Sequence, residues 1–158
     1  MAISIQVTSR RPWLCPLSRR ELPPVFAAMA EALGIPDIDL DVLLVDDDAM
    51  AECNGGYLGC PGPTNVLAFP VPPGGIPGTA AGLILNLDAL ERESLLYGQD
   101  ILTHTLRLLA HGMAHIAGHD HGPAMDEAGA LAEAAALDAS GGTKGSAPWD
   151  SPPEKKRP

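Results

Sequence analysis

Residues 111–121 read His-Gly-Met-Ala-His-Ile-Ala-Gly-His-Asp-His, and this stretch dominates what the sequence predicts. His111 and His115 are four residues apart, so on a helix their side chains share one face about 6 Å apart. Both imidazoles then reach one zinc ion with Zn–N bonds of about 2.0–2.1 Å. Gly118 can adopt a positive φ and end the helix, after which the chain can turn back and bring His121 to the ion. Three protein ligands leave the fourth tetrahedral position to water, as in catalytic zinc sites.

Two other interpretations explain this stretch less well than a zinc-dependent hydrolase does: histidines that only interact with the helix dipole, and a metzincin-like peptidase site. Histidine near a helix C-terminus interacts favourably with the helix dipole, which accounts for one such residue but not for a cluster. Four of the chain's five histidines lie between positions 111 and 121. The metzincin metalloproteases share the offsets in His-Glu-x-x-His-x-x-Gly-x-x-His, where the Glu is the general base. Gly112 occupies that place here and can move no proton, so the sequence favours a different metal-dependent hydrolase over a peptidase.

Three polar residues around the stretch are further site candidates. His104 precedes His111 by seven residues and is therefore about 10 Å further along the helix axis, too far to share the ion. We expect it either to line the substrate groove or to be packed. His119 lies in the predicted turn, where its ring can point to solvent, and Asp120 can orient a ligand histidine or cap the turn. No general base is evident, and His119, Asp120 or a zinc-bound hydroxide could serve.

The chain resembles the YbeY family of bacterial single-strand-specific endoribonucleases in two separate motifs. The family signature His-Gly-x-Leu-His-Leu-x-Gly-Tyr-Asp-His matches residues 111–121, with Ala114, Ile116 and His119 as the differences. The family segment Leu-Asn-x-x-Tyr-Arg, a short gap and Pro-Thr-Asp-Val-Leu-Ser-Phe-Pro corresponds to Cys-Asn-Gly-Gly-Tyr-Leu at 53–58 and Pro-Thr-Asn-Val-Leu-Ala-Phe-Pro at 63–70. Residues 82–88 follow in the order of the family's Gly-Asp-Ile-x-Ile-Ser-x-Asp. Order and spacing agree from about residue 40 to 135.

The resemblance implies a function and a set of site residues. His111, His115 and His121 would hold one zinc ion, and Asn54, Tyr57, Thr64 and His104 are candidates to contact substrate. The departures are Leu58 in place of an arginine, and Asn65 and Leu83 in place of aspartates. Phosphoryl-transfer chemistry benefits from a cation beside the developing oxyanion, which Leu58 cannot supply. Metal binding is therefore a firmer expectation than activity.

Composition restricts the class of protein. The net charge is −10 and the pI about 4.7, which argues against a broad nucleic-acid-binding surface. A bound zinc ion or a locally basic groove could still attract RNA. The sequence contains no run of 18 apolar residues, so no membrane-spanning helix is predicted. Apolar and polar residues alternate at the N-terminus, which is typical of a strand and not of a signal peptide, so we expect a cytoplasmic protein. Residues 1–138 are expected to form one domain, and residues 139–158, rich in Gly, Ser, Pro and charge, a disordered tail.

The order of secondary-structure signals predicts an α+β fold. Strands are expected at 3–7, 38–45, 64–69 and 82–87. Helices are expected at 25–33, from a cap at Asp46 or Asp47 to about 54, at 88–97, 100–117 and 123–138. Gly55 and Gly56 are expected to stop the second of these helices, and Asp88 and Asp100 to cap the third and fourth. We therefore predict a mixed sheet of about four strands packed with helices, and a zinc site at the end of a central helix.

The function expected from these observations is zinc-dependent cleavage of single-stranded RNA in ribosomal RNA maturation. By the family resemblance this includes processing of the 16S ribosomal RNA 3′ end and ribosome quality control, with the ribosome or ribosomal proteins as partners. Neither DNA nor a membrane is expected as a partner. Two alternatives remain open. One is a catalytically impaired, zinc-containing RNA- or ribosome-binding module, and the other is a metal-dependent hydrolase of another substrate.

Overall fold

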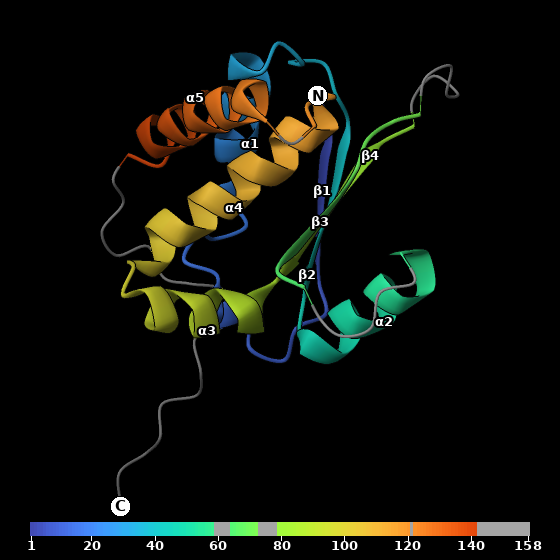
Figure 1. The fold of residues 1–158 in the computed structure, drawn as a ribbon, viewed down its shortest axis with the longest axis vertical. Helices are drawn as coiled ribbons and strands as arrows, with labels where there is room; N and C mark the ends of the chain where they lie inside the picture. Colours follow the sequence, from blue (N-terminus) through green and yellow to red (C-terminus); the bar gives the residue numbers. More distant parts are fainter. Residues whose placement is uncertain (59–63, 73–78, 121, 142–158) are drawn as a thin grey trace, which may run out of the picture.

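Strands and helices are interleaved up to β4, and the described elements from Leu87 onward are helices (Figure 1). The structure, a computed structural model, describes residues 1–58, 64–72, 79–120 and 122–141, and residues 54–58 in their backbone alone. The strands are β1 (Ile3–Val7), β2 (Leu40–Val45), β3 (Val66–Phe69) and β4 (Ala81–Asn86). The helices are η1 (Pro12–Leu14), α1 (Leu22–Ala32), α2 (Asp47–Leu58), α3 (Leu87–Tyr97), α4 (Ile101–Ile116) and α5 (Pro123–Ala139).

The described strands form one mixed sheet in the order β1-β2-β4-β3. β1 pairs with β2 and β2 with β4 in parallel, whereas β3 pairs with β4 antiparallel at the edge. Alternating residues of β2 and β4 are buried, as expected of strands that face a helical layer. The predicted α+β class and the mixed four-stranded sheet are confirmed.

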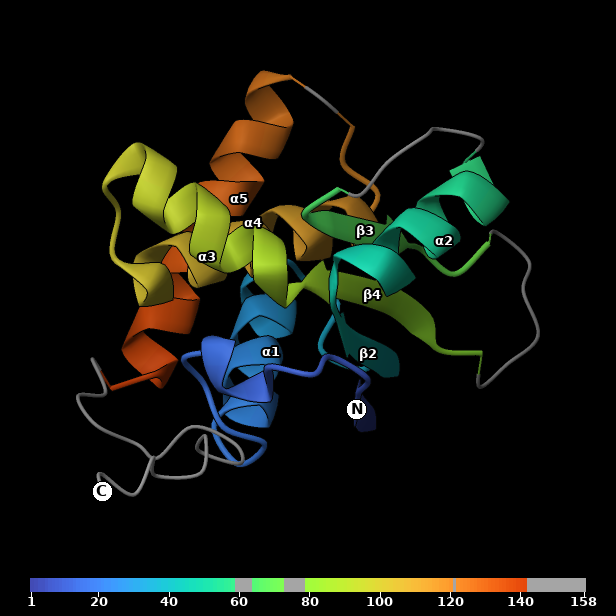
Figure 2. The same cartoon turned by 90° about the horizontal axis from the view of Figure 1, so that it is seen from below.

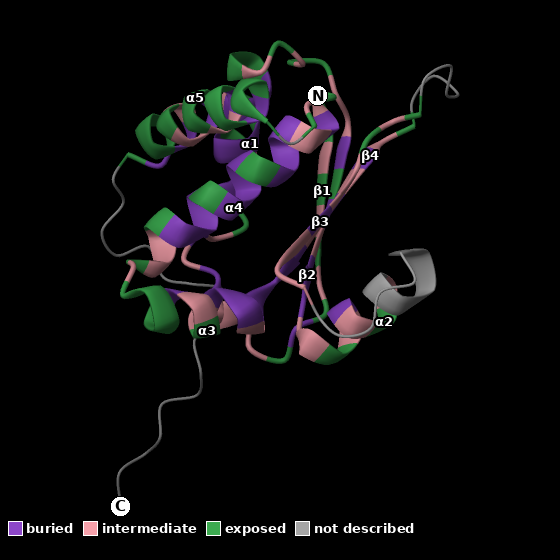
Figure 3. Ribbon diagram, viewed as in Figure 1, coloured by how far each residue is buried: buried purple, intermediate pink, exposed green. Residues whose placement is uncertain are grey.

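Helices cover the two faces of the sheet unequally. α1, α4 and α5 lie on one face and α2 lies on the other, while α3 crosses near the end of the sheet (Figures 1 and 2). The larger core fills the space between the sheet and α1, α4 and α5 (Figure 3). A smaller core of Val45, Met50 and Leu67 lies beneath α2. No helix in the described part of the chain has the length and apolar character needed to cross a membrane.

α4 is the central helix and packs unusually close to the sheet at one residue. Gly112 is buried, and a Cβ added there would lie 2.7 Å from Cδ1 of Leu83 and 3.4 Å from Cγ2 of Val66. Leu83 has no exposed surface, so its side chain has little room to withdraw. Glycine at position 112 therefore lets α4 pack against Leu83 and Val66 without displacing their side chains.

Capping signals located most helix ends, with two corrections. Asp46 accepts a hydrogen bond from the N–H of Ala49, and Asp100 accepts one from Thr103, as predicted. α3 is capped by Asn86, whose Oδ1 accepts from the N–H groups of Asp88 and Ala89, and not by Asp88. The prediction that glycines end α2 is also wrong. The helix continues through Gly55 and Gly56 to Leu58, because glycine weakens a helix by about 1 kcal/mol but does not by itself end one.

The close approach at Gly112 gives a stability prediction. In Gly112→Ala the overlap of the added methyl group with Leu83 should cost about 1–3 kcal/mol, against about 1 kcal/mol that alanine gains over glycine in a helix, so the free energy of unfolding should fall by up to about 2 kcal/mol. Urea unfolding followed by circular dichroism measures the change. Gly129→Ala on α5 is the matched control, because nothing lies within 4 Å of its Cβ and alanine favours the helix by about 1 kcal/mol. An equal gain in both variants would contradict the packing argument.

Candidate metal centre and substrate groove

α4 ends in a turn that redirects the chain at the histidine cluster. Gly118 has φ 96°, and its N–H donates to the carbonyl of His115 at 2.9 Å. The N–H of His119 donates to the carbonyl of Ala114 at 3.1 Å. These two bonds around a left-handed glycine form a Schellman-type helix end, which a residue with a side chain would strain. The predicted role of Gly118 is confirmed, and residues 119 and 120 leave the helix axis.

His111 and His115 lie side by side on the outer part of α4. Their ring centroids are 4.8 Å apart with planes at 86°, His111 being exposed and His115 half-buried. Two imidazoles one helical turn apart present nitrogen donors to a common point, which suits a zinc ion. His121, the third predicted ligand, lies outside the described residues. No group of three metal-ligating side chains lies together within the described residues, so His111 and His115 would supply two of the donors that a zinc site needs.

His111 also lines a groove between α4 and α5. The groove has a volume of about 290 Å³ and is lined by residues of both helices: Arg107, His111, Met125, Asp126, Gly129, Ala130 and Glu133. Arg107 and His111 are one turn apart on α4, and Asp126 and Glu133 face them from α5. The groove thus joins one candidate metal ligand to one cation and two carboxylates. The i, i+4 spacing of Arg107 and His111 can be read from the sequence. The sequence does not show that residues of α5 line the same groove.

The two candidate catalytic residues lie beyond the end of α4. His119 is half-buried and lines a separate cavity of about 240 Å³, together with residues of α5 and of the α1 end such as Leu33. Asp120 is exposed. The structure does not bring His119 to the groove lined by His111. Catalysis by His119 or Asp120 stays a prediction, and the placement of His119 does not favour it.

His104 is packed between α3 and α4. It is 5% exposed, its Nε2 lies 2.9 Å from Oε1 of Glu93, and the ring of Tyr97 meets its own edge-on. Glu93 in turn accepts hydrogen bonds of 3.2 and 3.3 Å from Nδ2 of Asn65. Through Glu93, His104 therefore links α4 to the loop before β3. Of the two expectations for His104, this burial favours packing over direct contact with substrate.

The other candidate substrate contacts come from the loop before β3 and from α2. Thr64 is half-buried, and its carbonyl accepts a hydrogen bond of 3.0 Å from Nδ2 of Asn86. Asn54 and Tyr57 lie on α2, but their side chains fall outside the described residues. Their roles stay predictions.

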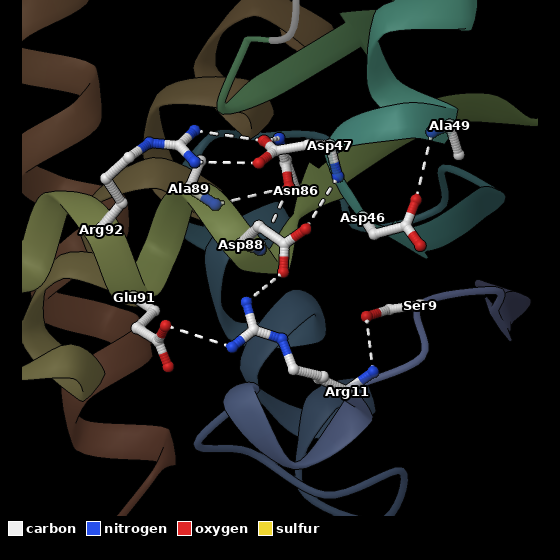
Figure 4. A network of polar contacts seen from close by, with 10 residues as sticks. All are labelled: Ser9, Arg11, Asp46, Asp47, Ala49, Asn86, Asp88, Ala89, Glu91 and Arg92. Atoms are coloured by element: carbon white, nitrogen blue, oxygen red, sulfur yellow. Dashed lines mark hydrogen bonds and ion pairs between the residues drawn. The ribbon is translucent and has the colours of Figure 1, made fainter.

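A polar network occupies the ends of β2 and β4 (Figure 4). The fully buried Asn86 donates from Nδ2 to Asp47 at 2.8 Å, and Asp88 accepts from the N–H of Asp47. Arg92 binds Asp47 through two hydrogen bonds of 2.9 and 3.1 Å. Arg11 binds Asp88 at 2.6 Å and Glu91 at 3.2 Å. The network fixes the starts of α2 and α3 and neutralises two arginines.

Comparison with known proteins agrees with the fold and the motifs. A family model described as endoribonuclease YbeY matches residues 19–136. A protein named endoribonuclease YbeY from Nitratidesulfovibrio vulgaris is 40% identical, over 81% of this chain and 90% of that protein. The chain belongs to the YbeY family. A relative of the same name from Lawsonia intracellularis is 43% identical, over 73% of this chain and 83% of the relative.

A solved structure shows the same fold. The solution structure of a Thermotoga maritima protein superimposes with a TM-score of 0.61 at 22% identity, covering 86% of this chain and 89% of that one. At this identity the likeness speaks for the fold alone. Membership of the YbeY family explains the fold and the sequence motifs of this chain. The residues of α5 that line the groove were not predicted from the motifs.

Arg92 and Asp47 give a prediction about pH. The hydrogen bonds from Arg92, aided by Asn86, hold the pKa of Asp47 below its usual value despite partial burial. The stability that these hydrogen bonds contribute is therefore fully present above the ordinary carboxyl pKa of about 4. It is lost as the pH falls through the lowered pKa of Asp47 in the folded protein. Arg92→Gln should lower the free energy of unfolding by about 0.5–1 kcal/mol at pH 7, since the pair is partly solvent-screened.

The test is urea unfolding of wild type and Arg92→Gln between pH 7 and the lowest pH at which both fold. The difference between them should be constant above about pH 5 and should shrink toward acid. Arg20→Gln, at an exposed arginine before α1, controls for the change in net charge. A difference that does not shrink would assign the effect to packing of the Arg92 side chain instead.

Proposed function

We propose that this chain is a zinc-dependent endoribonuclease that cleaves single-stranded RNA in ribosomal RNA maturation. Family membership and the name shared by its relatives support the reaction class. The observation that carries the proposal is the pair His111–His115, placed edge-to-face on α4, of which His111 lines the α4–α5 groove. Processing of the 16S ribosomal RNA 3′ end, ribosome quality control and a cytoplasmic location belong to the same proposal.

His111, His115 and His121 are the residues that would hold zinc. When bound, zinc lowers the pKa of a coordinated water and polarises a phosphoryl oxygen. The chain itself holds His111 and His115 at one turn's spacing, and the left-handed Gly118 redirects the chain after α4, while His121 is proposed as the third ligand on the sequence motif alone. A rigid helix packed on a sheet is a suitable support for such a site, because ligand positions must be fixed closely.

Peptide hydrolysis is a poor alternative. The residue next to the first histidine would be the base in a metzincin, but Gly112 is buried against Leu83 and Val66. An acidic side chain at that position would enter the core and not the groove. The better alternative is a zinc-containing RNA- or ribosome-binding module without catalysis, and the residue that favours it is Leu58. DNA and membranes have no part in either proposal.

The metal site gives a prediction for one ligand. His115→Ala should lose the single zinc per chain, measured by mass spectrometry of the metal, and cleavage of a labelled single-stranded RNA should fall at least about 100-fold. His119→Ala is the matched control and should keep both properties, because His119 lines a different cavity. If His119→Ala keeps zinc but loses cleavage, then His119 is the general base. If wild type binds zinc and cuts no RNA, the nuclease proposal fails and the binding module is favoured.

Position 58 gives a second prediction. Leu58→Arg should raise the rate of RNA cleavage without changing zinc content, because a cation near the scissile phosphate stabilises negative charge that develops in the transition state. We expect a gain of about tenfold or more in kcat. Leu58→Gln is the control for polarity without charge. No gain in Leu58→Arg over Leu58→Gln would indicate that a cation elsewhere already serves the reaction.

A further inference from the structure

We infer that Arg107 binds a phosphate of the RNA beside the scissile one, in the α4–α5 groove. The inference deepens the proposed function and rests on it, because it names a substrate contact for the same site. Arg107 lies one turn before His111 on α4, and both residues line the groove. The Cβ atoms of residues four apart on a helix are about 6 Å apart. Arg107 can therefore contact a phosphate of the RNA next to one that lies at His111.

The positions of the described arginines also favour Arg107 as the phosphate-binding residue. Of the ten lysines and arginines, the six in the described ranges are Arg10, Arg11, Arg19, Arg20, Arg92 and Arg107. Arg11 and Arg92 are held by carboxylates at 2.6–3.2 Å, and Arg19 donates to the carbonyl of Ile5. Arg10 lines a cavity with four aspartates, and Arg20 precedes α1. Among the described cations, Arg107 is the one that lines the groove of His111.

Arg107 is also held weakly enough to exchange partners. Its Nε lies 3.8 Å from Oε1 of Glu133, and its NH1 donates to the neutral amide of Gln99 at 3.1 Å. About half of the Arg107 side chain and a third of the Glu133 side chain are exposed. Exposed ion pairs of this length contribute little, whereas a guanidinium binds a phosphate through paired, charge-assisted hydrogen bonds. A phosphate entering the groove can therefore replace Glu133.

The groove has no other positive side chain among the described residues. Its remaining ionisable groups besides His111 are Asp126 and Glu133, both of which repel RNA. Without Arg107, the described wall of the groove would be negative apart from the charge of a bound metal. Arg107 therefore offsets the acidity of the groove where the substrate has to enter. Because it contacts the strand away from the reacting atoms, it should act on binding and not on the chemical step.

The first experiment compares Arg107→Gln and Arg107→Lys with wild type, with Arg20→Gln as the matched loss of one exposed arginine. Steady-state cleavage of a single-stranded RNA by the zinc-loaded proteins should show KM raised about tenfold in Arg107→Gln, kcat within about twofold, and partial rescue in Arg107→Lys. Binding of the same RNA by chelator-treated protein, followed by fluorescence anisotropy, gives a readout that does not need activity. The slope of log K against log salt should fall in magnitude by about 0.7 for one lost phosphate contact.

A second pair of variants tests the weak ion pair between Arg107 and Glu133. Glu133→Gln should bind the RNA several-fold more tightly, since it frees Arg107 and removes a repulsive charge from the groove. Glu127→Gln removes the same charge from α5 but lines the other cavity, so its gain should be smaller. In Glu133→Gln combined with Arg107→Gln, most of the gain should disappear.

The outcomes separate this inference from the proposed function. If wild type cleaves RNA but Arg107→Gln matches it, or if Arg20→Gln weakens binding equally, the inference is wrong while the nuclease proposal stands. If wild type neither binds nor cleaves RNA, both are wrong. Thermal unfolding of each variant confirms that it is folded, which is expected because residues 107, 127 and 133 have exposed or half-buried side chains.

Discussion

The contact between Gly112 and the sheet sets the position of everything that we assign to the site. It fixes both the distance of α4 from β4 and the rotation of the helix about its own axis. At 3.6 residues per turn, His111 is about 100° and His115 about 60° around the axis from Gly112. These angles explain why His115 is half-buried and His111 exposed. A side chain at position 112 would require Leu83 or the helix to shift, and a shift of the helix would move both imidazoles together.

Charge is the second constraint, because an acidic protein has to accept a polyanion. The structure meets this by separating its arginines into two groups. Arg11 and Arg92 are bound by carboxylates in the network around Asn86, where Arg92 joins α3 to α2 and Arg11 joins the segment after β1 to α3. Arg107 is held only loosely beside the candidate metal ligands. Net charge therefore says little about where RNA can bind, since the distribution of neutralised and available cations decides it.

Local signals in the sequence predicted what depends on local interactions. The helix caps at Asp46 and Asp100, the left-handed Gly118 and the histidine spacing on α4 all follow from neighbours within a few residues. Contacts between distant segments carry no comparable local signal. Asn86 takes the capping role expected of Asp88, and α2 runs through two glycines. The α5 side of the groove and the burial of His104 against Glu93 likewise depend on tertiary packing, which no spacing rule encodes.

The departures from the family motifs at positions 65 and 83 have structural partners in this chain. Asn65 donates both of its bonds to Glu93, whereas an aspartate there would set two carboxylates against each other. Leu83 is fully buried against Gly112, where a carboxylate would be desolvated without a partner. Asn65 and Leu83 therefore both fit their surroundings in this chain. The side chain of Leu58 lies outside the described residues, and this is the departure that replaces an arginine of the family motif by an uncharged residue. The question of activity in this chain thus reduces to what stabilises negative charge at the scissile phosphate without an arginine at position 58, since Arg107 is assigned to a neighbouring phosphate and to binding.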